Sequence, residues 1–174
     1  MANYLDSKCS GCPYRYVPHL IGTQYNFRHN PLSKENNGSQ TLIVLQSPGV
    51  EEWRNGAPLQ PTVIKGGSAG RRISLSWDRV HHTRTDYDIT NAVQCFQGNI
   101  GNRDLPIDPH AVSKCLEWLK DDIVNGNYTR IIAFGDIAFE SCSTILSSYL
   151  NSIILDEGLH PNGGLRRTIL DAKW

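Results

Sequence analysis

The stretch that decides the fold is Thr41-Leu42-Ile43-Val44-Leu45-Gln46-Ser47-Pro48-Gly49, in which a short apolar run ends in a polar turn. The run is rich in β-forming side chains and shows no alternation of apolar and polar residues, which indicates a strand that is buried on both faces. Such strands occur in parallel sheets that helices cover on both sides. The stretch therefore predicts a central strand of an α/β sheet, with a loop at its carboxyl end.

The remaining sequence alternates between predicted strands and helices. Further strands are predicted over residues 87–90, 130–134 and 152–155. Helices are predicted from the cap Ser68 to about Val80, from the cap Asp108 to about residue 124, and over about residues 137–149. Residues 1–40 are expected to form an irregular wrap, and residues 50–67 a loop. This order predicts one domain over residues 1–174, a three-layer α/β/α fold with a central four-stranded parallel sheet.

Composition narrows the class of protein. The 174 residues contain 17 Lys plus Arg and 17 Asp plus Glu, so the formal net charge is zero, and 39 % of the residues are hydrophobic. A neutral chain does not bind polyanions through its net charge. A local basic patch is still compatible with a net charge of zero. No apolar stretch reaches the roughly 18–20 residues that span a bilayer, and the start lacks the features of a signal peptide. We expect a cytoplasmic monomer with no membrane partner.

Five cysteines occur in the chain, an odd number that does not suggest a disulfide framework. They are Cys9, Cys12, Cys95, Cys115 and Cys142. The Cys-x-x-Cys unit at the start favours a metal, cluster or redox site. Four thiolates suit structural zinc and a [4Fe–4S] cluster equally well by ligand count. The alternative is that these residues are small buried hydrophobic side chains, which we expect for Cys142 in its apolar helix.

The parallel sheet predicts where a ligand would bind. In open α/β sheets, ligands bind at the carboxyl ends of the strands. Three predicted strands end in polar segments there: residues 46–49, Asn91, and the pair His160-Pro161. We therefore expect these three segments to meet around one site.

Several motifs occur in an order that carries a resemblance. The first strand runs into Leu45-Gln46-Ser47-Pro48-Gly49, followed by Gly56-Ala57-Pro58-Leu59 and Gly67-Ser68-Ala69-Gly70. The second runs into Thr90-Asn91-Ala92-Val93-Gln94-Cys95, followed by Gly101-Asn102-Arg103-Asp104-Leu105-Pro106 and then Cys115. A His160-Pro161-Asn162 loop with Arg166-Arg167 comes near the end. Over about residues 9–170, the chain resembles the uracil-DNA glycosylase superfamily, most closely its iron–sulfur branches, families 4 and 5.

The resemblance implies a cofactor and a base pocket. It implies a [4Fe–4S] cluster held by Cys9, Cys12, Cys95 and Cys115. The amide of Asn91 would pair with the edge of a pyrimidine that has been swung out of DNA. His160 would stabilise the oxyanion that develops on the departing base. The residues expected to line the pocket are Gln46, Ser47, Pro48, Gly49, Leu59 and Asn91.

The chain departs from the family pattern inside this pocket. Gln46 stands where family 4 carries a catalytic Glu, and an amide can only position water. Leu59 stands where an aromatic ring stacks on uracil, and Ser47 replaces a small apolar residue. Residues 60–66 form an insertion beside the same wall. These departures favour either a pocket for a base larger than uracil or a loss of activity.

The same resemblance implies a surface that contacts DNA. Gly163 and Gly164 would let a loop enter the duplex, with Leu165 as the wedge that fills the gap left by the base. Arg166 would contact phosphates, as would the start of the predicted helix at Ser68 and Arg71. Taken as isolated residues, these arginines would more commonly belong to a solvated surface.

The function implied is a monofunctional DNA glycosylase, which hydrolyses the N-glycosidic bond of uracil or a modified pyrimidine and leaves an abasic site. Its partner would be DNA that contains the target base, in base-excision repair or in removal of modified bases from foreign or phage DNA. The alternative from another class is a catalytically inactive DNA-binding protein on the same scaffold, which Gln46 favours. A zinc-stabilised binder of small molecules is a third interpretation.

Overall fold

The computed structural model describes residues 8–14, 31–60, 68–100, 103–149, 152–158 and 171–174. Its main sheet has four parallel strands in the order β2-β1-β5-β6. The strands are β1 (Thr41–Leu45), β2 (Asp88–Asn91), β5 (Arg130–Phe134) and β6 (Ile154–Gly158). The predicted four-stranded parallel sheet is confirmed, and the last strand begins two residues later than predicted.

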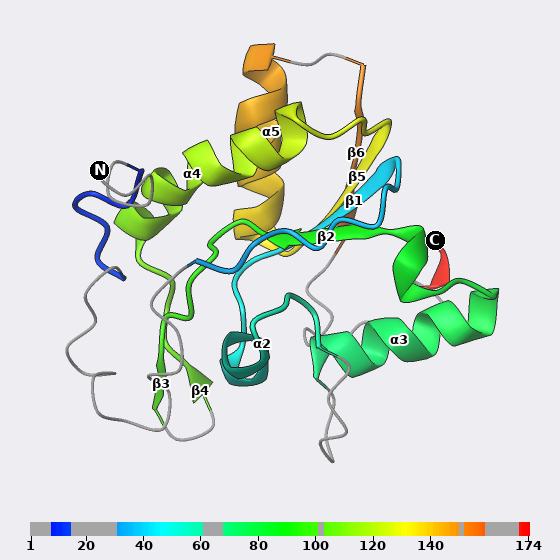
Figure 1. The fold of residues 1–174 in the computed structure, drawn as a ribbon, viewed down its shortest axis with the longest axis horizontal. Coiled ribbons are helices and arrows are strands. Elements are labelled where there is room, and N and C mark those ends of the chain that lie inside the picture. Colours follow the sequence, from blue (N-terminus) through cyan, green and yellow to red (C-terminus); the bar gives the residue numbers. More distant parts are fainter. Residues whose placement is uncertain (1–7, 15–30, 61–67, 101–102, 150–151, 159–170) are drawn as a thin grey trace.

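Helices cover both faces of this sheet (Figure 1). They are α2 (Val50–Asn55), α3 (Ala69–Val80), α4 (Pro109–Val124) and α5 (Asp136–Tyr149), with a short 3-10 turn η2 (Arg84–Asp86). The helices α4 and α5 pack on one face and α3 on the other, which confirms the three-layer α/β/α fold. No helix of the described residues is long and apolar enough to cross a membrane.

Alternate residues of the central strands supply the two cores. On β5, Ile131 and Ala133 face α4 and α5, whereas Ile132 and Phe134 face α3. All four are fully buried. Because side chains alternate across a strand, an uninterrupted apolar run fills both cores at once. This is the physical reason that the apolar run at residues 41–45 predicts a central strand correctly.

The predicted helix caps are also confirmed. The Ser68 hydroxyl accepts a hydrogen bond from the Arg71 backbone N–H (3.3 Å) at the start of α3. The Asp108 carboxylate accepts one from the His110 N–H (2.7 Å) at the start of α4. Each side chain satisfies a backbone donor that the first turn of a helix leaves unpaired. These local signals could therefore be interpreted without tertiary information.

Two features differ from the sequence-based expectation. The predicted loop over 50–67 contains helix α2, which starts at Gly49 without a side-chain cap and ends at Gly56. Glu51 and Glu52 in its first turn favour the helix because carboxylates interact well with the helix N-terminus. The second feature is a small antiparallel pair, β3 (Asn99–Ile100) with β4 (Arg103–Asp104).

The described N-terminal segments pack along the core. Residues 31–40 follow the outer edge of β2, where the backbones of Glu35 and Ile89 exchange two hydrogen bonds (2.8 and 3.0 Å). Residues 8–14 lie against α4, where the Tyr14 hydroxyl accepts a hydrogen bond from the Asp108 N–H (2.7 Å). The N-terminal part of the chain therefore covers a sheet edge that would otherwise expose unpaired backbone groups.

Candidate functional site

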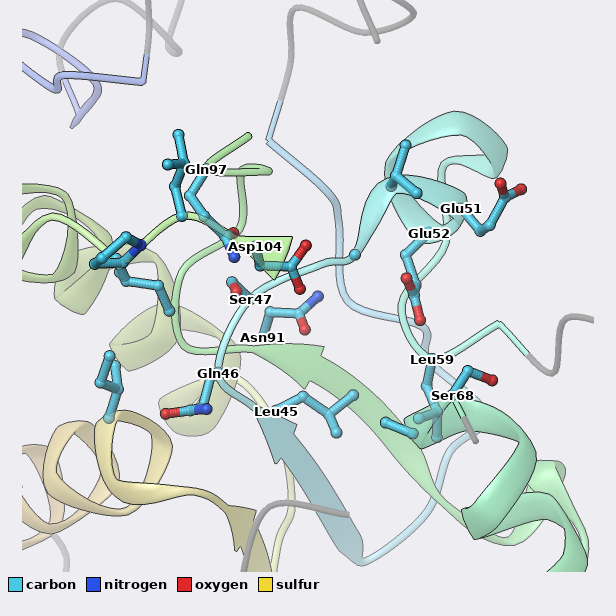
Figure 2. Close-up of a pocket in the computed structure, with 17 residues that line it drawn as sticks. Leu45, Gln46, Ser47, Glu51, Glu52, Leu59, Ser68, Asn91, Gln97 and Asp104 are labelled. Atoms are coloured by element: carbon cyan, nitrogen blue, oxygen red, sulfur yellow. The ribbon is translucent and has the colours of Figure 1, made fainter. Parts of the chain in front are cut away.

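A cavity of about 670 Å³ opens at the carboxyl ends of β1 and β2. Its walls come from the loop after β1, helix α2, the start of α3, the β4 region and the start of α5. This is where a parallel sheet is expected to bind a ligand. Figure 2 shows the side chains that converge on this cavity.

Asn91 is the last residue of β2 and lies on the cavity floor. It pairs in parallel register with Leu45, the last residue of β1. The residue is 2 % exposed, and its Nδ2 has no hydrogen-bond partner among the described residues. A buried amide without a partner costs free energy unless a ligand or water satisfies it. The structure therefore brings Asn91 to a binding site with its hydrogen-bonding capacity unused.

Gln97 is a second buried amide on this cavity, and the sequence analysis missed it. The residue is 5 % exposed, and its Oε1 has no hydrogen-bond partner among the described residues. Phe96, its neighbour, is buried in a small apolar cluster with Leu32 and Trp53, which holds this part of the chain in place. No sequence signal distinguishes Gln97, because a Gln in a loop is ordinarily exposed.

Glu52 supplies a partly buried carboxyl group from α2. Burial raises its pKa, and the negative charge of Asp104 raises it further, whereas backbone hydrogen bonds at Gly49 and Gln60 act against this rise. Gly49 leaves room for the Glu52 carboxylate, because a Cβ at residue 49 would lie 2.7 Å from the Glu52 Oε2. Gly49, predicted to line the base pocket, does line the cavity and also leaves room for this carboxylate.

Gln46 lines the cavity but lies on the opposite side from Glu52 (Figure 2). Its side chain packs on Gly135, where an added Cβ would lie 2.7 Å from the Gln46 Cδ. The backbone of the loop is fixed, because the Gln46 carbonyl accepts a hydrogen bond from the Val93 N–H (2.8 Å). The side chain of Gln46 is therefore held beside α5.

The other predicted pocket residues are brought together in part. Ser47 and Leu59 line the cavity, as does Ser68 at the start of α3. Pro48 is buried beside them and Arg71 is exposed. The backbone of Leu59 is left-handed (φ 48°), and its carbonyl accepts a hydrogen bond from Arg84. An aliphatic side chain therefore occupies the wall where the resemblance implies an aromatic ring.

The predicted loop toward DNA lies outside the described residues. It comprises Gly163, Gly164, Leu165 and Arg166, and His160, the predicted catalytic residue of the base pocket, lies outside the described residues as well. The chain on either side of this loop is fixed, by β6 before it and by the C-terminal residues after it. Trp174 packs against the core beside Phe134 and donates a hydrogen bond to the Ser76 hydroxyl (2.7 Å).

Four of the five cysteines come from three segments of the chain, one of which is α4. Cys9 and Cys12 belong to one turn, in which the Cys12 N–H donates a hydrogen bond to the Cys9 carbonyl (3.0 Å). Cys95 follows β2, and Cys115 lies on α4. Burial raises the pKa of Cys95 and Cys115, to about 12 for Cys115, and the thiols of Cys9 and Cys12 raise both further. The four thiols therefore lie within electrostatic reach of one another.

This donor set fits a four-thiolate centre in type and number. The described side chains include no group of three or more His, Cys, Asp or Glu residues arranged to hold a metal ion. Cys95 and Cys115 are buried and Cys9 and Cys12 partly buried, and a bound cation would favour the ionised form of all four thiols. Cys142 is separate, because its pKa is raised to about 12 by burial alone, in the apolar core under α5.

No family model matches this chain, and no curated protein matches it either.

Proposed function

We propose that this chain is a DNA glycosylase of the uracil-DNA glycosylase type, which hydrolyses the N-glycosidic bond of uracil or a modified pyrimidine. The observation that carries the proposal is Asn91, a fully buried amide at a strand end whose Nδ2 has no partner among the described residues and faces a cavity. A planar base with a donor and an acceptor on one edge complements such an amide. The cavity opens outward, as a pocket for an extruded nucleotide requires.

The proposed reaction is a dissociative hydrolysis. The bond between the base nitrogen and C1′ of the sugar breaks, and its electron pair leaves with the base. Water then adds to C1′ and releases a proton, so that an abasic sugar and a free base remain. Asn91 holds the base by its pairing edge, and His160 donates a hydrogen bond to the oxygen on which negative charge develops. No Lys is assigned to Schiff-base chemistry, so strand cleavage is not part of the proposal.

The proposal includes a [4Fe–4S] cluster bound by Cys9, Cys12, Cys95 and Cys115. Such a cluster would act here as a structural brace rather than in the hydrolysis. Its ligands would join the N-terminal turn, the segment after β2 and helix α4. Beyond the effect of burial, the Cys12 thiol raises the pKa of Cys9, and the Cys9 and Cys12 thiols raise the pKa values of Cys95 and Cys115, which supports this grouping. The segment after β2 also carries Gln97, so the brace would hold one wall of the cavity.

The experiment is an excision assay on duplex and single-stranded oligonucleotides that contain one uracil or one modified cytosine, followed by alkali to cut abasic sites. We expect cleavage by the wild-type chain and a loss of about 10²–10³-fold for Asn91→Ala. We expect His160→Ala to lower the rate while DNA binding is retained. Equal rates for Asn91→Ala and the wild type would refute the pocket.

One observation favours the second candidate, an inactive DNA-binding protein. The Gln46 side chain packs on Gly135, on the far side of the cavity from Glu52, and it carries no carboxylate. A site without a carboxylate at this position stabilises a positively charged sugar less well. DNA binding without excision of any base in the assay would establish this candidate in place of the enzyme.

A further inference from the structure

Two buried amide atoms that lack a hydrogen-bond partner among the described residues line the same cavity. They are the Nδ2 of Asn91 and the Oε1 of Gln97. Within the described part of the chain, the Nε1 of Trp77 is the one other buried side-chain atom in this state, and it lies in the core that α3 forms with the sheet. Because buried polar groups are nearly always paired, two such atoms on one cavity indicate a ligand that pairs with both.

The two atoms have opposite hydrogen-bonding character. The Nδ2 of Asn91 is a donor, and the Oε1 of Gln97 is an acceptor. A complementary ligand therefore brings an acceptor for Asn91 and a donor for Gln97. An apolar ligand, or a ligand that carries acceptors alone, would leave the Gln97 oxygen buried and unpaired.

The backbone holds Gln97 in place on both sides. Phe96 before it is buried in the cluster with Leu32 and Trp53. Gly98 after it has a left-handed backbone (φ 89°), and its carbonyl accepts a hydrogen bond from the Leu105 N–H (3.0 Å) at the base of the β3–β4 pair. Figure 2 shows the side chains of Gln97 and Asn91 on the same cavity. A polar group that is fixed before the ligand arrives contributes to specificity at little cost in conformational freedom.

The two classes of pyrimidine differ in what they leave for Gln97 once Asn91 holds the pairing edge through both atoms of its amide. A base of the uracil type has one donor on this edge, the N–H at ring position 3, and the Asn91 Oδ1 accepts it. A base of the cytosine type has an exocyclic amino group with two hydrogens. One of these bonds to the Asn91 Oδ1, the ring nitrogen accepts from the Asn91 Nδ2, and the second hydrogen is left over.

We propose that Gln97 is a specificity-determining residue, whose Oε1 accepts the second amino hydrogen of a 4-aminopyrimidine held by Asn91. This inference rests on the proposed function and narrows its substrate class to bases of the cytosine type. A base of the uracil type carries a carbonyl oxygen where cytosine carries the amino group, so two acceptors would face each other at Gln97. A site built to bond a donor discriminates strongly against a ligand that lacks it.

The test uses pairs of bases that differ only in the group at position 4. The pairs are cytosine with uracil and 5-hydroxymethylcytosine with 5-hydroxymethyluracil, each placed in a duplex opposite an abasic-site analogue so that no base pair has to be broken. A 2′-fluoro sugar slows cleavage of the N-glycosidic bond, which allows the equilibrium Kd to be measured. We expect the wild type to bind the 4-amino member of each pair at least about tenfold more tightly. Equal values, or tighter binding of the 4-oxo member, would overturn the proposal.

Variants of residue 97 assign the preference to its oxygen. Gln97→Leu removes the acceptor and should lower the ratio of the two Kd values about tenfold, whereas Gln97→Glu keeps an acceptor and should retain the preference. Gln94→Leu is the matched control. Gln94 is a buried amide of the same segment, but it donates to Asp122 (3.1 Å) and is not among the residues that line the cavity. The control should therefore leave the ratio unchanged, and an unchanged ratio in Gln97→Leu would remove Gln97 from base recognition.

Excision of the same bases in ordinary deoxyribose duplexes separates this inference from the proposed function. If bases are excised but the Kd ratio does not depend on residue 97, the assignment of Gln97 fails and the glycosylase proposal stands. If no base is excised, but Kd favours the 4-amino members and Gln97→Leu abolishes this preference, the glycosylase proposal fails and the role of Gln97 stands. If there is neither excision nor a preference, both fail.

Discussion

Asn91 stands opposite Leu45 in the parallel register of the sheet, each as the last residue of its strand. The ladder continues past this pair, because the Ala92 N–H donates to the Leu45 carbonyl (2.7 Å). The backbone at Asn91 and at the next residue is therefore fixed by β1. The Nδ2 of Asn91 is nevertheless left without a partner among the described residues. This combination of a rigid support and an unused polar group is typical of a site prepared for a ligand.

We expect Asn91→Ala to lower the rate of excision about 10²–10³-fold and to leave the free energy of unfolding within about 1 kcal/mol of the wild type, since the Nδ2 it removes makes no hydrogen bond with the described residues. Gln94→Ala is the control. Gln94 is equally buried, but it donates a hydrogen bond to Asp122 (3.1 Å). Its loss should cost about 1–3 kcal/mol and preserve excision. Urea denaturation and the excision assay measure the two quantities, and the reverse pattern would contradict this account.

Iron content should depend on Cys95 and be independent of Cys142. Both thiols are buried, but only the pKa of Cys95 is raised by other thiols as well as by burial. We expect Cys95→Ala to reduce bound iron and sulfide to background and to lower Tm. Cys142→Ala should keep both contents while losing some core packing. Metal analysis on the two purified variants checks this, and equal iron in both would remove Cys95 from the ligand set.

Glu52→Gln should stabilise the fold at neutral pH. Burial raises the pKa of Glu52, so the native state holds its proton more tightly than the unfolded chain does. Stability therefore falls as pH rises from the unfolded pKa through the folded one, and the neutral amide escapes this loss. We expect a rise in Tm of about 2–4 °C at pH 7, the size that ~1 kcal/mol produces in a chain of this length. Near pH 4 the difference should vanish, and a constant difference across the range would exclude the carboxyl as its cause.

Tyr128→Phe should cost about 1–3 kcal/mol. The Tyr128 hydroxyl donates to the buried Asp88 carboxylate (2.6 Å) and accepts from Lys34 (2.8 Å). The variant leaves one Asp88 oxygen and the Lys34 ammonium without this partner. Tyr87→Phe is the control, because its hydroxyl bonds only partly buried His82 (2.9 Å) and should cost less than about 1 kcal/mol. Denaturant unfolding compares the two, and equal costs would contradict the buried network.

Gly135→Ala should destabilise the chain more than Gly38→Ala does. Both glycines have a left-handed backbone, with φ of +92° and +76°, which costs an alanine about 1–2 kcal/mol. Only the alanine at residue 135 would also collide, with the Gln46 side chain, whereas the space around Gly38 is open. The excess cost should therefore disappear in a Gln46→Ala background. Persistence of the excess in the double variant would show that Gln46 is not its source.

The sequence by itself determined the fold, because the signals for it are local. An apolar run such as residues 130–134, or a cap such as Asp108 before Pro109, depends on side chains that are close along the chain. The same reasoning placed Asn91 at a strand end, and the rule for parallel sheets then placed it at a binding site. The error at α2 arose because Gly56 and the prolines and glycines that follow it suggest a loop, whereas Gly49 and Gly56 here lie at the two ends of a helix.

Only the tertiary structure decided which polar groups surround Asn91. Glu52, Gln97 and Asp104 come from three separate elements and carry no pattern in the sequence that links them. They meet because the sheet register and the packing of α2 and the β3–β4 pair bring their backbones together. Whether a carboxyl or an amide is buried, and whether it lacks a partner, depends on atoms far away along the chain. Burial and hydrogen bonding of this kind are properties of the packed fold, and they gave this cavity its acidic, acceptor-rich character.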